Sequence, residues 1–91
     1  MVKRTAQIRN AFGIHVRPSA VIVKRAREYT GTIEVTSERG NCVDAKNLLG
    51  VISLGVTQGQ IVTLTVDGAD EKQWAAIMVE LFETEFDFAR T

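Results

Sequence analysis

The alternation of apolar and polar side chains marks most of the strands in this chain. Residues 32–36 alternate with a period of two, which is typical of a strand with one buried face. Residues 61–66 give the clearest strand pattern of all. A shorter, partly alternating segment predicts a first strand over about residues 2–9. After a predicted hairpin turn at residues 37–41, residues 42–45 form a short returning strand.

Helical spacing appears first after residue 15. The segment from Val16 to about Glu28 places Ile22, Ala26 and Tyr29 on one apolar face. Pro18 falls in the first turn of this predicted helix, where its missing amide hydrogen costs nothing. The sequence therefore predicts an amphipathic helix that buries one side.

Two further helices follow, each with a candidate N-cap residue. Asn47 is a good N-cap for a brief helix from Leu48 to about Leu54, and Asp70 is expected to cap the last helix. The last helix carries a stripe of large apolar side chains at spacings of three and four residues, which predicts its core-facing side. The stripe consists of Trp74, Ile77, Met78, Leu81 and Phe82.

The predicted elements follow the order βαββαβα. One-sided apolar patterns on four strands and three helices indicate an α+β fold, with the helices on one face of a four-stranded antiparallel sheet. The other face of the sheet is expected to meet solvent. A chain of 91 residues allows one domain, so residues 1–91 are expected to form a single unit.

Composition excludes several classes of partner. Eleven basic and eleven acidic residues cancel, so nothing in the charge balance calls for nucleic acid or an anionic membrane. No apolar run approaches the ~20 residues of a membrane span, and the first residues lack the apolar stretch of a secretion signal. The single cysteine cannot form a disulfide within the chain. These features fit a cytoplasmic protein without membrane insertion.

The segment Gly13–Pro18 holds the candidate chemistry. His15, the only histidine of the chain, stands just before the predicted helix, and Arg17 lies two residues beyond it. An imidazole is a nucleophile at neutral pH, and a phosphoryl group on its nitrogen retains a high transfer potential. The unpartnered amides near Val16 would favour an anion. The pattern suggests a phosphoryl group carried on His15, with Arg17 as a charged donor.

Other interpretations of this segment remain open on these residues alone. His15 is also compatible with an ordinary loop histidine before a helix that begins with proline. A metal site is poorly supported, because the chain has one histidine and one cysteine and no second ligand at helical spacing. A hydrolase is equally unsupported, since no Gly-x-Ser-x-Gly elbow is present.

A second segment changes this balance. Residues 44–59 closely resemble the second signature of the HPr family, the histidine-containing phosphocarrier proteins of the bacterial sugar phosphotransferase system. Residues 13–20 resemble the active-site signature of the same family. The likeness extends from about Val2 to Phe82, and the order of the elements agrees with it.

The resemblance implies an open-faced β-sandwich and a relay function. His15 matches the residue that accepts a phosphoryl group on Nδ1 from enzyme I, which takes it from phosphoenolpyruvate, and Arg17 matches the accompanying arginine. The carrier would pass the group to IIA domains of sugar permeases. Such a protein is not an enzyme with its own small-molecule site, and it needs no cofactor. A monomer is the default expectation for a relay that presents one face to several partners.

The resemblance also implies a docking surface, which is a shallow apolar patch with a basic rim. Its matching apolar residues are Leu48 and Leu49 with Ala20 nearby, and the candidate rim residues are Lys24, Arg27 and Lys46. Two alternatives stay open from the residues themselves. Both leucines could face the core, and the basic residues could be no more than a solvated helix face.

The chain departs from the family pattern at position 47. Many HPr proteins carry a serine there, which a dedicated kinase phosphorylates, whereas this chain has Asn47. Asparagine keeps the N-cap function but offers no hydroxyl, so we expect that control to be absent. Ser53 is interpreted as a helix-packing residue rather than a substitute, and Cys42 as a small buried side chain on a strand.

Two competing functions remain. One is a carrier in the nitrogen-related regulatory branch of the phosphotransferase system, which the sequence does not separate from sugar transport. The other is a non-phosphorylated interaction module that binds partners through the patch around Leu48. The presence of both His15 and Arg17 argues against the second.

Overall fold

The computed structural model describes residues 1–10, 14 and 16–85. Its elements follow the predicted order βαββαβα. They are β1 (Val2–Gln7), α1 (Val16–Ala26), β2 (Thr32–Thr36), β3 (Cys42–Asp44), α2 (Leu48–Ser53), β4 (Ile61–Asp67) and α3 (Glu71–Phe82). The first strand and first helix each end two residues earlier than expected. The amide of Ile8 nevertheless still donates to the carbonyl of Gln60, at 2.8 Å.

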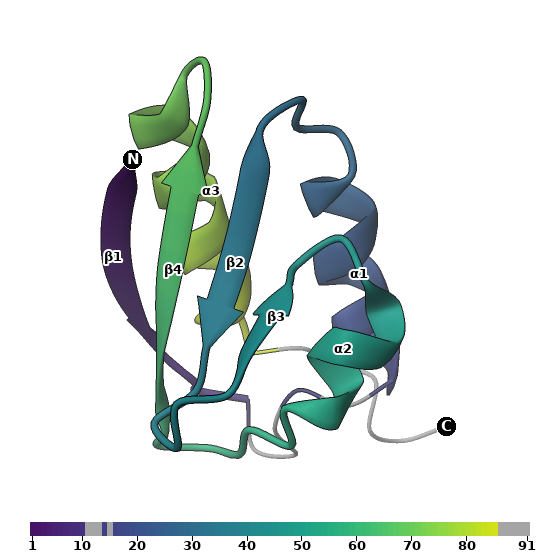
Figure 1. Ribbon diagram of the computed structural model, residues 1–91. Helices are drawn as coiled ribbons and strands as arrows, with labels where there is room; N and C mark the ends of the chain where they lie inside the picture. The colour runs from purple at the N-terminus through teal and green to yellow at the C-terminus, as the bar shows by residue number, and fades with distance from the viewer. Residues whose placement is uncertain (11–13, 15, 86–91) are drawn as a thin grey trace.

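The four strands form one antiparallel sheet in the order β1-β4-β2-β3. Helices α1 and α3 cover one face of this sheet, and α2 lies beyond β3 and against α1 (Figure 1). The α+β class and the antiparallel sheet with its helices are therefore as predicted. None of the helices in the described ranges has the length and apolar character needed to cross a bilayer.

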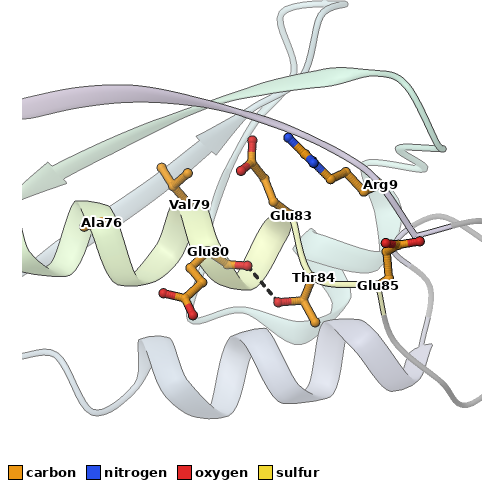
Figure 2. A pocket seen from close by; sticks show the side chains of 7 residues that line it. All are labelled: Arg9, Ala76, Val79, Glu80, Glu83, Thr84 and Glu85. Atoms are coloured by element: carbon orange, nitrogen blue, oxygen red, sulfur yellow. Dashed lines mark hydrogen bonds between the residues drawn. The ribbon is translucent and has the colours of Figure 1, made fainter.

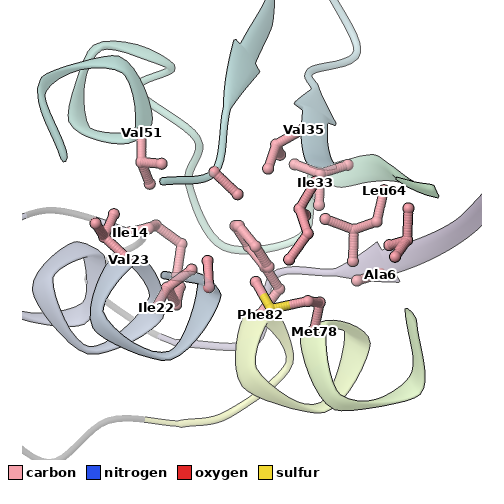
Figure 3. Packing of buried hydrophobic residues seen from close by; sticks show 14 of the residues in the cluster. Ala6, Ile14, Ile22, Val23, Ile33, Val35, Val51, Leu64, Met78 and Phe82 are labelled. Carbon is pink, nitrogen blue, oxygen red and sulfur yellow. The ribbon is translucent and has the colours of Figure 1, made fainter. Parts of the chain in front are cut away.

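Period-two alternation sets which face of the sheet is buried. In β4, Val62, Leu64 and Val66 are fully buried, whereas the two threonines between them are half-buried. The same alternation buries Ile33 and Val35 in β2. Figure 3 shows Ile33, Val35 and Leu64 of the sheet facing side chains of α1 and α3, which close the core between sheet and helices.

The apolar stripe of α3 is only partly as predicted. Met78 and Phe82 are fully buried, and Ala75 lies with them on the buried face. Trp74 and Leu81 pack against the core from its edges and stay half-buried. The centre of the buried face thus runs through residues 75, 78 and 82, because these share one side of the helix at spacings of three and four.

The two predicted N-caps have different outcomes. The side chain of Asn47 accepts a hydrogen bond from the amide of Gly50 at 3.1 Å, which confirms it as the cap of α2. Asp70 precedes α3 but makes no side-chain cap bond, so that prediction is wrong. Its backbone is left-handed, with φ 56° and ψ 31°. A capping residue normally has extended backbone, which aims its side-chain oxygen at the first amides of the helix.

Cys42 also differs from the prediction, since it is exposed rather than buried. It lies on β3, an edge strand, opposite Thr36. The next residue, Val43, is half-buried and packs against the core. Because neighbouring side chains of a strand point to opposite faces, Val43 takes the inward position and Cys42 faces solvent.

Candidate functional site

The proposed phosphoacceptor His15 and its neighbour Gly13 lie outside the described residues. The structure describes the residues on either side of position 15. Ile14 is buried, and its amide donates to the carbonyl of Val56 at 3.1 Å. Val16 is the first residue of α1 and is 60% exposed. The structure therefore anchors Ile14 in the core and begins a helix directly after position 15.

The start of α1 is suited to an anion. The first four amides of an α-helix have no partner within the helix, and its dipole adds positive potential at that end. The first turn of α1 contains no acidic side chain, and Arg17 is exposed on it. Pro18 is the third residue of the helix and is buried, so it lies in the first turn as predicted. These features match what a phosphoryl group at this end would require.

Four of the six predicted docking residues surround one cavity between α1 and α2. This α1–α2 groove has a volume of about 290 Å³ and is lined by Ala20, Val23, Lys24, Arg27 and Leu48. Leu48 is half-buried there, whereas Leu49, the next residue on α2, is 77% exposed. The structure thus joins apolar and basic side chains from two separate sequence segments on one surface.

Lys46 lies differently from the other predicted rim residues. Its ammonium donates to the carbonyl oxygens of Tyr29 and Gly31, at 2.6 Å and 2.7 Å, and the side chain is half-buried. The carbonyl of Lys46 in turn accepts a bond from Nε of Arg27 at 3.0 Å. The charge of Lys46 is therefore engaged by backbone of its own chain.

A larger groove of about 550 Å³ lies along the end of α3 (Figure 2). Ala76 and Val79 supply apolar surface, and the charged residues around it are Arg9, Glu80, Glu83 and Glu85. Glu83 accepts a bond from the backbone amide of Gln7 at 3.0 Å, so this carboxylate covers a donor on the free edge of β1. Sequence reasoning did not find this groove, because its residues are remote in the chain and form no motif.

Comparison with known proteins identifies the family to which these features belong. Residues 2–84 match the family described as PTS HPr component phosphorylation site. The chain belongs to the HPr family. Members of this family are phosphocarriers of the phosphotransferase system rather than catalytic enzymes, so this chain is a phosphoryl carrier whose partners are proteins of that system.

Individual HPr proteins are similar over almost the whole chain. Phosphocarrier protein HPr of Haemophilus influenzae is 38% identical over 84 residues, which cover 92% of this chain and 98% of the relative. HPr of Borreliella burgdorferi is 36% identical over 84 residues, or 92% and 96% of the two chains.

Solved HPr structures share the fold. HPr-C-His of Thermoanaerobacter tengcongensis superposes with a TM-score of 0.81 at 34% identity, over 94% of this chain and all of that one. HPr of Bacillus anthracis gives a TM-score of 0.83 at 26% identity, over 88% and 94% of the two chains. The sheet and helices seen here are thus those of HPr proteins.

Asn47 stabilises α2 in this HPr protein, and its replacement should show by how much. Asn47→Ala removes the acceptor for the Gly50 amide, so we expect the free energy of unfolding to fall by about 0.5–2 kcal/mol in urea denaturation. Asn47→Ser is the matched control, because a serine oxygen keeps the cap and should keep the stability within ~0.5 kcal/mol. Equal stability of Asn47→Ala and wild type would contradict the capping role.

Proposed function

We propose that this HPr protein accepts a phosphoryl group on His15 from phospho-enzyme I and passes it to IIA domains of sugar permeases. One observation carries the proposal most strongly. The helix that begins directly after His15 has no acidic residue in its first turn, and the same helix contributes Ala20 and Lys24 to the groove beside α2, with Arg27 in the turn just after it. We place the protein in the cytoplasm, as one domain over residues 1–91 and as a monomer.

The chemical step follows from the residues at this end of α1. A lone pair on Nδ1 of neutral His15 attacks phosphorus, a P–N bond forms, and the bond from phosphorus to enzyme I breaks. Charge spreads over three oxygens in the loose transition state. The first amides of α1 and the guanidinium of Arg17 would stabilise that charge. In the transfer to a IIA domain, the P–N bond to His15 breaks and a bond from phosphorus to the IIA domain forms, which regenerates His15.

The α1–α2 groove would receive the partners. Leu48 and the exposed Leu49 supply apolar contact, and Lys24 and Arg27 supply positive charge at the rim. A small apolar patch fits transient complexes, which bury less surface than stable ones. Rim charges raise the association rate with acidic partners, so the arrangement favours brief and frequent encounters.

Replacing Arg17 tests its part in the transfer. Arg17→Ala should slow phosphoryl transfer from enzyme I by about 10- to 100-fold, because a hydrogen bond to a charged group is worth about 1.5–3 kcal/mol. The side chain is exposed, so the urea midpoint should change little. Arg17→Lys keeps the charge without the planar donor set, so its transfer rate should lie between those of wild type and Arg17→Ala. An unchanged rate in Arg17→Ala would remove the arginine from the mechanism.

The choice of acceptor tests the proposed function itself. The protein is loaded with phosphate by enzyme I and phosphoenolpyruvate, and purified IIA domains of sugar permeases are then added. We expect rapid transfer to these domains and slow transfer to the IIA protein of the nitrogen-related branch. The reverse preference would assign the chain to the regulatory branch. Failure to load at all would favour the non-phosphorylated interaction module.

A further inference from the structure

We infer that Lys46 is a positioning residue, which holds α2 and its docking leucines against the end of α1, rather than a charge that faces partners. The inference rests on the proposed function, because it assumes that Leu48 and Leu49 contact partners. It also departs from the expectation that Lys46 belongs to the basic rim.

The ammonium of Lys46 points toward backbone of its own chain. Two of its three donors bond the carbonyls of Tyr29 and Gly31, in the segment that leads from α1 to β2. The same nitrogen lies 6.0 Å from the ring centroid of Tyr29, within reach of a cation–π interaction. The Tyr29 ring is itself fixed, since it is 4% exposed and stacks on Trp74 with centroids 5.0 Å apart.

The backbone of Lys46 is bonded as well. Its amide donates to Oδ1 of Asp44 at 2.9 Å, and its carbonyl accepts from Nε of Arg27 at 3.0 Å. Lys46 thus connects three parts of the fold. Its amide bonds the end of β3, its carbonyl bonds the end of α1, and its side chain bonds the turn before β2. Lys24, by contrast, is exposed and lines the α1–α2 groove.

Lys46 is close in the sequence to the two docking leucines. Leu48 follows Lys46 by two residues and Leu49 by three, with the capping Asn47 between. Helix α2 has six residues, and helices of this length are not stable without tertiary support. We therefore expect the placement of both leucines to depend on the bonds that Lys46 makes.

The experiment compares Lys46→Met with Lys24→Met. For each variant, KM and kcat of phosphoryl transfer from phospho-enzyme I are measured over a range of salt concentrations, and amide hydrogen exchange of α2 is followed in the free protein. Lys46→Met should raise KM by about 3- to 10-fold, as for residues that act through a neighbouring element. Its kcat should not change, its salt dependence should match wild type, and the amides of α2 should exchange faster.

Lys24→Met should behave in the opposite way. Removing a rim charge reduces the salt dependence of association and leaves exchange in α2 unchanged. Lys46→Arg, which restores donors and charge, should recover protection of α2 and most of the KM, and it serves as the second variant if Lys46→Met does not fold. A reduced salt dependence with unchanged exchange in Lys46→Met would overturn the inference, and so would an unchanged KM.

The two proposals fail separately in this design. If wild type takes no phosphate from enzyme I, the proposed function is wrong. Hydrogen exchange of α2 needs no partner, so it still reports whether Lys46 holds this helix.

Discussion

Replacing Phe82 with alanine should lower the free energy of unfolding by about 3–5 kcal/mol, the range for removal of a buried aromatic side chain. Phe82 is fully buried at the end of α3 and lies in the core with Met78 and residues of the sheet and of α1 (Figure 3). Such a loss is a large part of the 5–15 kcal/mol by which domains are usually stable. It should therefore leave the variant partly unfolded at moderate temperature.

Urea denaturation followed by circular dichroism measures this loss. The midpoint for Phe82→Ala should fall while the slope of the transition stays near that of wild type. Gln73→Ala is the matched control, because Gln73 is exposed on the same helix and its loss should cost less than ~0.5 kcal/mol. Equal effects of the two substitutions would show that the end of α3 does not pack as described.

The strands with a clear alternation of apolar and polar residues could be predicted from the sequence. Residues 32–36 form β2 with the predicted bounds, and the pattern over residues 61–66 gives β4 with one residue added. In both, one side faces the helices and the other solvent, so the alternation is complete. The N-cap at Asn47 was also predictable, because capping involves residues three positions apart.

Features that depend on the three-dimensional arrangement of the chain were not predictable in this way. The exposure of Cys42 follows from the register of β3 against β2, which puts Val43 inward. The failure of Asp70 as a cap follows from a left-handed backbone in the turn after β4. The bonds of Lys46 depend on the positions of two carbonyls that lie 17 and 15 residues earlier in the chain. The backbone at Asp70 and the bonds of Lys46 leave no periodic signal, and the alternation over residues 42–45 is too short to fix on its own which side of β3 is buried.

The site was predicted from its two signatures rather than from periodicity. Helical spacing placed residues near 20–27 on one helix, but it did not show that they meet α2. The family resemblance supplied that link, and the structure brings Ala20, Lys24, Arg27 and Leu48 to one groove. The exposure of Leu49 settles an open question, since the sequence left both leucines free to face the core.

Replacing His15 with alanine should abolish phosphorylation by enzyme I. His15 is the only histidine in the chain, so no other imidazole can take its place. Serine, threonine and carboxylate side chains would need a different activation and would give a product of different stability. Circular dichroism and the urea midpoint of His15→Ala verify that loss of labelling is not loss of fold. Arg17→Ala, run beside it, should be labelled slowly but to completion.

The most direct measurement is the phosphate content of the intact protein after incubation with enzyme I and phosphoenolpyruvate, before and after mild acid. We expect one acid-labile, base-stable phosphate on wild type and none on His15→Ala. Phosphate that remains on folded His15→Ala, or phosphate on wild type that survives acid, would contradict the assignment of His15 as the carrier residue.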